Sequence, residues 1–205
     1  MDEPLLGCPR GFEDWRQIRE ICGLTADAGR PIEEFRRPFF AEYWVGPYQR
    51  LLPEWTLVAR RGGRVVGYLT GCPDTASFLA RRQILCRLPL LAGVLAGRYL
   101  WTLDTGRFVR RAFFLERTPG FGVGPALEAL KSHPAHLHIN LRDGDRGGGL
   151  GRLLIEEFAR RLAVRGVCGI HLVCGPGPTG FYRHLGFRTL AAIKAPVELC
   201  LMGRP

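Results

Sequence analysis

Apolar residues recur with a helical period over the first 48 positions of the chain. Residues 15–28 carry apolar side chains at near-helical spacing, which predicts an amphipathic helix. Residues 30–48 predict a second helical segment, in which Pro31 suits the start and Gly46-Pro47 suits the end. Two helical segments are therefore expected within residues 15–48.

A strand pattern replaces the helical one after residue 54. The stretches 55–61 and 64–71 are rich in apolar and β-branched residues and flank Gly62-Gly63. Paired glycines favour the tight turns of hairpins, because those turns need a positive φ at their central residues. These segments predict an antiparallel β-hairpin.

Residues 73–134 combine long apolar stretches with arginines, and we interpret them as helices broken at Pro89, Pro119 and Pro125. The most apolar run, residues 88–97, is about half the length that spans a bilayer, so a buried helix is the better interpretation. The pattern predicts a helical insertion, about residues 79–133, that packs on the sheet.

Alternation returns in residues 135–142. Two sets of side chains fall on opposite faces, as a strand requires: Leu137, Ile139 and Leu141 on one, His136, His138 and Asn140 on the other. A helical stripe follows and ends at Gly166. Further strands are predicted near residues 169–174, 187–190 and 197–202, with a short helix near 179–185. This order predicts a right-handed crossover within a mixed sheet.

The formal net charge of +10 raises the question of a nucleic-acid partner, because basic surfaces attract phosphate backbones. Of the 29 basic residues only Lys131 and Lys194 are lysines; the arginines are scattered along the chain. This distribution disfavours a dedicated nucleic-acid role and agrees with a preference for acidic or phosphorylated ligands.

The cysteines and the first residues bear on the compartment. Seven cysteines form no CxxC pair, which is typical of free thiols in a reducing environment. Residues 1–15 lack a basic segment followed by a long apolar run, so no secretory signal is expected. With 205 residues, 46% of them hydrophobic, the chain is expected to form a single cytoplasmic domain, residues 1–205, without membrane contact.

A glycine-rich turn, DRGGGLGRLL at residues 145–154, directly precedes the helical stripe. Such a turn can hold an anion, because the first helical N–H groups lack partners and glycine lets a ligand approach closely. A nucleotide P-loop is excluded, since Leu150 and Gly151 stand where its lysine and hydroxyl residue belong. The dinucleotide fingerprint fails because its third glycine falls on Arg152 or Leu154.

Arg146 to Gly151 instead fit the pattern R/Q-x-x-G-x-G/A. This segment resembles the pyrophosphate-binding signature of the GNAT family of acyl-CoA-dependent N-acetyltransferases. It follows a predicted strand, begins an amphipathic helix and lies about 30 residues before GFYRHLGF, which resembles the late F-Y-x-x-x-G-F motif of that family. The joint match is more specific than either motif alone.

Other stretches are similar to the acetyltransferase-like domain at the C-terminus of O-GlcNAcases and to its free-standing bacterial relatives. They are FFAEYWVGPY, VVGYLTGCPDTASF, HLHINL and FYRHLGF, within roughly residues 35–78 and 134–190, about half of the chain. The resemblance implies the GNAT fold, an α/β (α+β) architecture in which helices flank a mixed central sheet, here with a helical insertion.

The resemblance implies acetyl-CoA as the cosubstrate, lying where two parallel strands diverge. Pantetheine would bind the strand that precedes the glycine turn, and the turn would hold the pyrophosphate. The residues implied in cofactor binding are Ile139, Asn140, Leu141, Arg146, Gly147, Gly148, Gly149, Leu150, Gly151, Arg152 and Phe181.

Tyr182 matches the family's tyrosine that can protonate the leaving thiolate, and a phenol with a pKa of about 10 stays protonated at neutral pH. The alternative for Tyr182 is an aromatic core position.

An attacking amine must lose a proton, and the resemblance implies a base near this strand. His136 and His138 project from its polar face and titrate in the useful range, which makes them the catalytic candidates beside Tyr182. For either histidine, a satisfied polar residue on the sheet is the favoured interpretation. Four acidic residues stay open as bases: Asp104, Asp143, Glu42 and Glu198. We expect no metal at His133, His136 and His138, because no cysteine or carboxylate has ligand spacing nearby.

One loop departs from the family pattern. GPGPTG, residues 175–180, is short and lacks the asparagine that family members usually carry there. A side-chain contact to pantetheine is therefore expected to be missing. Tyr43, Trp44 and Tyr48 could line an acceptor pocket or pack helix against sheet.

Two functions are open. The leading one is an N-acetyltransferase that moves an acetyl group from acetyl-CoA directly to an amine on a small molecule or protein. Cysteine as an acyl carrier is less favoured, because neither Cys168 nor Cys174 sits in a recognisable Cys/His arrangement. The alternative is a catalytically weak or inactive GNAT-fold module that binds acyl-CoA or a partner. The acceptor is unspecified, and a homodimer is left open.

Overall fold

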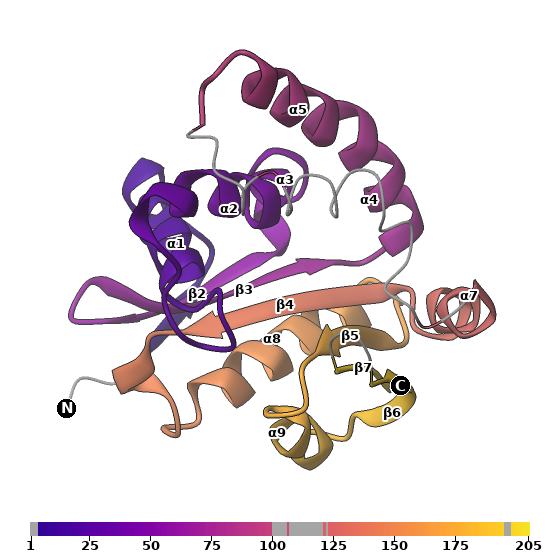
Figure 1. Ribbon diagram of the computed structural model, residues 1–205. Coiled ribbons are helices and arrows are strands. Elements are labelled where there is room, and N and C mark those ends of the chain that lie inside the picture. Colours follow the sequence, from indigo (N-terminus) through magenta and orange to yellow (C-terminus); the bar gives the residue numbers. More distant parts are fainter. Residues whose placement is uncertain (1–3, 100–105, 107–120, 122, 195–197) are drawn as a thin grey trace.

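The computed structural model describes residues 4–99, 106, 121, 123–194 and 198–205. Its centre is a seven-stranded sheet in the order β1-β2-β3-β4-β5-β7-β6 (Figure 1). The strands are β1 Leu5–Gly7, β2 Thr56–Arg61, β3 Arg64–Cys72, β4 Ala135–Leu141, β5 Ile170–Cys174, β6 Arg188–Ile193 and β7 Leu199–Arg204. Only β4 and β5 pair in parallel, so the predicted mixed sheet is confirmed.

Helices cover both faces of this sheet (Figure 1). They are α1 Phe12–Leu24, α2 Arg37–Trp44, α3 Gly46–Leu51, α4 Thr75–Arg82, α5 Leu88–Leu95, α7 Val123–Ser132, α8 Leu150–Val164 and α9 Thr179–His184. Helices α1 to α5 lie on one side, and α8 and α9 lie on the other. The predicted architecture of helices around a central sheet is therefore present.

Helix α8 supplies the apolar face that the helical stripe predicted. Its buried side chains enter the main core together with residues of β2 to β5. The Phe158 ring fills the space above Gly71 of β3, where a Cβ atom would lie only 2.1 Å from the ring. The glycine thus lets helix and sheet approach closely, since such an overlap cannot be tolerated without repacking.

The predicted hairpin is confirmed. Strands β2 and β3 pair antiparallel up to Arg61 and Arg64, which leaves Gly62-Gly63 as the turn. The φ angles of these glycines are 55° and 76°, the left-handed values that two-residue hairpin turns require.

The prolines of the second helical segment act differently from the prediction. The helix does not begin at Pro31: a 3₁₀ turn spans Glu34–Arg36 and α2 starts at Arg37. Gly46-Pro47 does not end the segment but begins α3. The backbone N–H groups of a helix's first turn have no partner within the helix, so proline, which lacks this group, can begin a helix as well as follow one.

Pro89 does not break the helix in the insertion. Helix α4, a π-helical turn at Gln83–Arg87 and α5 follow one another without a gap (Figure 1). The widened π turn accommodates the proline, which lacks an N–H and crowds the preceding turn. Pro125 lies near the start of α7, and Pro119 falls outside the described residues.

The apolar run 88–97 is helical, but it is buried on one side only. Leu90 and Val94 face the core, whereas Leu88 and Leu95 are 55% and 80% exposed. Among the described helices, none has both the length and the apolar character needed to cross a membrane.

Candidate functional site

Strands β4 and β5 diverge soon after they meet. Their register comprises Ala135↔Ile170 and His136↔His171, although β4 continues to Leu141. The Ala135 N–H donates to the Gly169 carbonyl of the β5 side at 3.2 Å. Backbone groups of alternate residues point to the same side of a strand, so those of Leu137, Ile139 and Leu141 also face β5, beyond the last recorded pair.

The glycine turn lies where β4 leads into α8. Gly147 and Gly149 have φ angles of 79° and 81°, and Gly149 is the N-cap residue of α8. No side chain caps this helix start. In the described part of the chain, no heavy atom lies within 4 Å of a Cβ atom placed on Gly147, Gly148 or Gly149. Backbone N–H groups and open space therefore meet at the positive end of a helix, which fits an anionic group such as a pyrophosphate.

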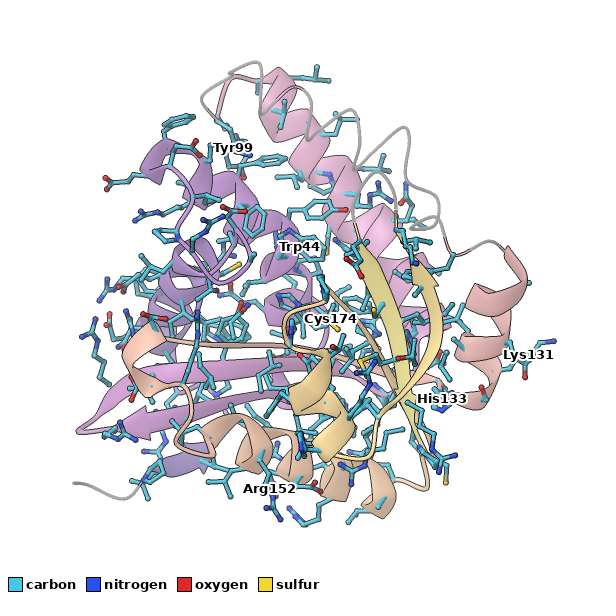
Figure 2. All side chains as sticks on the ribbon, turned by 60° about the horizontal axis from the view of Figure 1, so that its bottom comes forward. Trp44, Tyr99, Lys131, His133, Arg152 and Cys174 are labelled. Carbon is cyan, nitrogen blue, oxygen red and sulfur yellow. The ribbon has the colours of Figure 1, made fainter. Side chains whose placement is uncertain are left out.

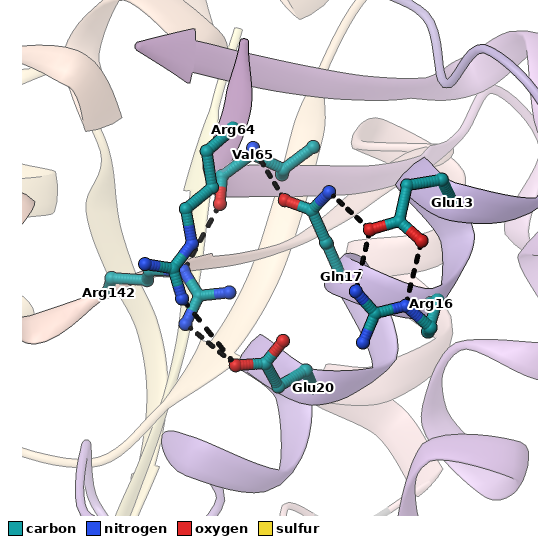
Figure 3. A network of polar contacts seen from close by, with 7 residues as sticks. All are labelled: Glu13, Arg16, Gln17, Glu20, Arg64, Val65 and Arg142. Atoms are coloured by element: carbon teal, nitrogen blue, oxygen red, sulfur yellow. Dashed lines mark hydrogen bonds and ion pairs between the residues drawn. The ribbon is translucent and has the colours of Figure 1, made fainter. Parts of the chain in front are cut away.

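The end of β4 is fixed by Arg142 (Figure 3). Its Nε donates to the Val65 carbonyl at 3.1 Å, and one terminal nitrogen donates to Glu20 of α1 at 3.0 Å. The Arg142 backbone N–H also donates to the Val66 carbonyl. These bonds join the strand end to α1 and β3, so the following turn starts from a fixed point.

Two ion pairs stabilise the segment that leads from β4 into the glycine turn. Arg61 contacts Asp145 at 2.5 Å, and Arg146 contacts Asp143 at 3.0 Å. Arg146 also donates to the carbonyl of Gly29, in the loop between α1 and α2, at 3.0 Å. Its guanidinium therefore ties the turn to that loop in addition to carrying the charge that the sequence predicted for binding.

Arg152 is placed differently from Arg146. It lies exposed on the first turn of α8 (Figure 2) and forms no ion pair with the residues that the structure describes. Of the two predicted arginines, Arg152 is thus the one with an uncommitted guanidinium.

Gly151, Phe181 and Tyr182 connect the turn to α9. A Cβ atom on Gly151 would lie 3.0 Å from the Phe181 ring, so glycine permits α8 and α9 to meet there. The Tyr182 ring packs between Phe181 and Phe187, with ring centroids 5.1 and 5.7 Å apart. Burial, together with the nearby Cys174, raises the pKa of Tyr182 above its ordinary value. The phenol is therefore protonated at neutral pH.

His136 uses both ring nitrogens for hydrogen bonds within the protein. The Thr75 hydroxyl donates to the Pro134 carbonyl at 2.6 Å, so it accepts from His136 Nδ1 at 2.7 Å. Nε2 then accepts from the Tyr48 hydroxyl at 2.7 Å. Burial lowers the pKa of His136 to about 3. The ring is neutral and fully partnered.

His138 lies on the same face of β4. The Asn140 side-chain amide donates to the Tyr68 hydroxyl and lies 3.1 Å from His138 Nε2, which therefore accepts from it. The ring proton is then on Nδ1. Trp44 of α2 stacks on the ring at 5.7 Å, and burial lowers the pKa of His138 to about 4. The side chain of Asn140, one of the predicted cofactor-binding residues, thus faces away from α8.

His133 and His171 complete a group of four histidines on this face. His171 lies beside His136 across the β4–β5 pair, with ring centroids 5.8 Å apart. Its Nδ1 donates to the His133 carbonyl at 2.6 Å. The His133 ring (Figure 2) lies over Gly203 of β7, where a Cβ atom would approach Nε2 to 2.8 Å. The described residues contain no group of three or more metal-ligating side chains placed to hold an ion.

The other predicted candidates are dispersed. Glu42 pairs with Arg19 and Arg50, Asp143 is exposed beside Arg146, and Glu198 is exposed. Asp104 lies outside the described residues.

The aromatic residues contact the histidine face. Trp44 and Tyr48 pack against β4 through His138 and His136, and the guanidinium of Arg82 lies 4.7 Å from the centre of the Tyr43 ring. Helix-to-sheet packing therefore accounts for Trp44 and Tyr48.

Two members of the site were missed by the sequence reasoning. His171 had a weak signal, as the single polar residue within the apolar run GIHLVC. Thr75 had none, because its hydroxyl meets His136 only when α4 crosses the start of β4.

The two buried histidines make the fold sensitive to acid. Their folded pKa values lie below the ordinary 6.5, so the unfolded chain binds protons that the folded chain does not. Stability is therefore lost as the pH falls below 6.5, by about 1.4 kcal/mol per pH unit for each histidine, until the folded pKa is reached. Urea unfolding between pH 7 and 5 should show this slope. His138→Asn should reduce this slope by about 1.4 kcal/mol per pH unit, the contribution of one histidine, and the exposed His184→Asn serves as the control.

Comparison with known proteins shows which folds this arrangement resembles. No family model matches the chain. The crystal structure of SsHAT is 29% identical in sequence, with a TM-score of 0.72 over 99% of this chain and 98% of that chain. The Escherichia coli ribosomal-protein-S18-alanine N-acetyltransferase is 14% identical, with a TM-score of 0.53 over 99% and 94%. Protein PH1933 from Pyrococcus horikoshii OT3 is 14% identical, with a TM-score of 0.57 over 98% of each chain.

The mixed seven-stranded sheet with its flanking helices matches the fold of these neighbours. The chain therefore has the GNAT fold, and its structural neighbours are GNAT acetyltransferases, the family that its two motifs resemble. This similarity supports acetyl transfer in general.

Proposed function

We propose that the chain is an acetyl-CoA-dependent N-acetyltransferase that transfers the acetyl group directly to an amine. The observation that carries the proposal is the open, uncapped glycine turn at the start of α8, next to the point where β4 and β5 diverge. A CoA molecule carries both groups that such a site could bind: a pyrophosphate for the turn and an extended pantetheine arm for β4.

Each part of the site has a role in binding. N–H groups of Gly147 to Leu150 would hold the pyrophosphate, with Arg152 adding positive charge. Backbone groups of Ile139 and Leu141 would orient the pantetheine arm, because they face the side from which β5 has diverged. When bound, acetyl-CoA supplies an activated thioester.

Direct transfer is favoured over a cysteine intermediate. Cys174 lies near Tyr182, and burial raises its pKa to about 11. A thiol held protonated is a poor nucleophile. The Tyr182 hydroxyl, protonated for the same physical reason, would instead donate a proton to the leaving sulfur. All seven cysteines are free thiols, which agrees with a cytoplasmic location.

Calorimetry with acetyl-CoA and an assay for released CoA thiol over a panel of amines test the proposal. Binding together with amine-dependent thiol release is the expected result. Absence of binding at millimolar acetyl-CoA would remove the proposed function. Binding without transfer to any amine would favour an acyl-CoA-binding module, for which the short Gly175–Pro178 segment is the supporting observation.

A further inference from the structure

The four histidines on the face opposite α8 differ in one respect, the availability of a nitrogen lone pair. His136 has none to offer, because Nδ1 donates to Thr75 and Nε2 accepts from Tyr48. His138 holds its proton on Nδ1 and shares the Nε2 lone pair with Asn140. Neither predicted histidine therefore presents an unshared lone pair to an incoming amine.

His171 is arranged the opposite way. A carbonyl oxygen only accepts, so the bond to the His133 carbonyl places the His171 proton on Nδ1. Nε2 then carries the lone pair. Among the residues that the structure describes, the ring's hydrogen-bond contacts are with the carbonyls of His133 and Ala135, which only accept and so leave that lone pair unshared. A backbone carbonyl that fixes the tautomer of a ring is how proteins commonly direct the other nitrogen toward a ligand.

His171 also lies at the place where the chemistry would occur. It forms the last pair between β4 and β5, and the strands diverge from the next residue onward. Its neighbours on β5, Ile170 and Leu172, point into the α8 core, so the His171 ring projects from the opposite face. An amine that reached the thioester from this face would arrive beside Nε2.

We infer that His171 is the general base of this acetyltransferase, a deduction that rests on the proposed function. The free amine forms a bond to the acetyl carbon while the thioester carbon–sulfur bond breaks. Nε2 of His171 takes the proton that the nitrogen sheds, and the leaving sulfur gains one from Tyr182. Solvent then removes the first proton and restores the second, so that an amide and a free CoA thiol are the only net products.

The surroundings of His171 keep its ring neutral. Burial and the neighbouring His133 lower its pKa, while the His133 and Ala135 carbonyls oppose that shift. The titratable and charged groups that face it are His136 on β4 and His133 before β4, with Tyr48 of α3 and Arg82 of α4 acting on His136. On β7 the opposed residue is Gly203, which adds no charge. The base is therefore unprotonated at neutral pH.

His171→Asn tests the inference with little change in shape. The asparagine amide can still donate to the His133 carbonyl, but the substitution removes Nε2. We expect kcat to fall by about 10²-fold or more at pH 7, with the affinity for acetyl-CoA unchanged. The acid limb of kcat/KM, which lies below the ordinary histidine value of about 6.5 in the native protein, should disappear.

His184→Asn is the matched control. His184 is exposed on α9 and also bonds a backbone carbonyl, that of Gly180, through Nδ1 at 2.7 Å. It should keep the native rate and pH profile. An unchanged kcat and acid limb in His171→Asn would overturn the assignment while leaving the proposed function intact. Native protein that binds acetyl-CoA but acetylates no amine would overturn both.

Discussion

Gly148→Glu is expected to weaken acetyl-CoA binding by about 100-fold or more without disturbing the fold. The substitution places a carboxylate in the open space at the start of α8, where the pyrophosphate would lie. Two like charges about 4 Å apart repel by about 4 kcal/mol in a partly screened site, which exceeds the roughly 3 kcal/mol needed for a 100-fold change in Kd. Calorimetry with acetyl-CoA measures the effect directly.

Gly148 suits this test because its φ is not in the left-handed region and nothing lies within 4 Å of an added Cβ. Gly149 has the same open space but a φ of 81°, so a glutamate there would also strain the backbone. Gly144→Glu is the control: it adds the same charge earlier in the loop, at another open position with ordinary φ. Equal affinity in the Gly148 and Gly144 variants would contradict a pyrophosphate site at the turn.

Tyr182→Phe is expected to lower kcat by about 10²-fold while leaving the Kd for acetyl-CoA within about twofold. The hydroxyl would act only as the thioester breaks, when negative charge develops on the leaving sulfur. The ring itself packs between Phe181 and Phe187, and phenylalanine preserves that packing. Thiol-release kinetics under saturating acetyl-CoA measure the change.

An acetyl thioester with a more acidic leaving thiol separates proton donation from packing. A good leaving group needs less protonation, so the defect of Tyr182→Phe should shrink with that substrate. A defect of the same size with both thioesters would assign Tyr182 to the packing of α9 alone. Equal turnover of variant and native protein would take the residue out of the mechanism.

Local signals in the sequence predicted the elements that carry the cofactor side of the candidate site. Alternation over residues 135–142 predicted β4, the glycine pair predicted the hairpin, and the apolar stripe after Gly149 predicted α8. Each of these predictions depends on the spacing of apolar residues or on a positive φ angle, and both are set by a few neighbouring residues. Proline was less informative, because the same residue starts α3, follows a π turn at residue 89 and lies outside any helix at residue 31.

The side of the candidate site that carries the histidines could not be predicted in the same way. The sequence placed His136 and His138 on one face of a strand, which is correct, but the partners of the two His136 nitrogens come from α3 and α4. Arg146 likewise sits in a recognisable motif, yet its bond to the Gly29 carbonyl joins residues 117 positions apart. Hydrogen-bond partners decide whether a nitrogen donates, accepts or is free, and distant segments supply them.

The sequence by itself determined the fold, the glycine turn that we propose as an anion site and the candidate Tyr182, because periodicity, glycine content and spacing are local properties of the chain. Only the tertiary structure decided which histidine holds an unshared lone pair and where β4 and β5 part. The first depends on the hydrogen bond between the His133 carbonyl and the His171 ring, and the second on the pairing of β4 with β5 over two residues. Neither event has a signature in one segment alone.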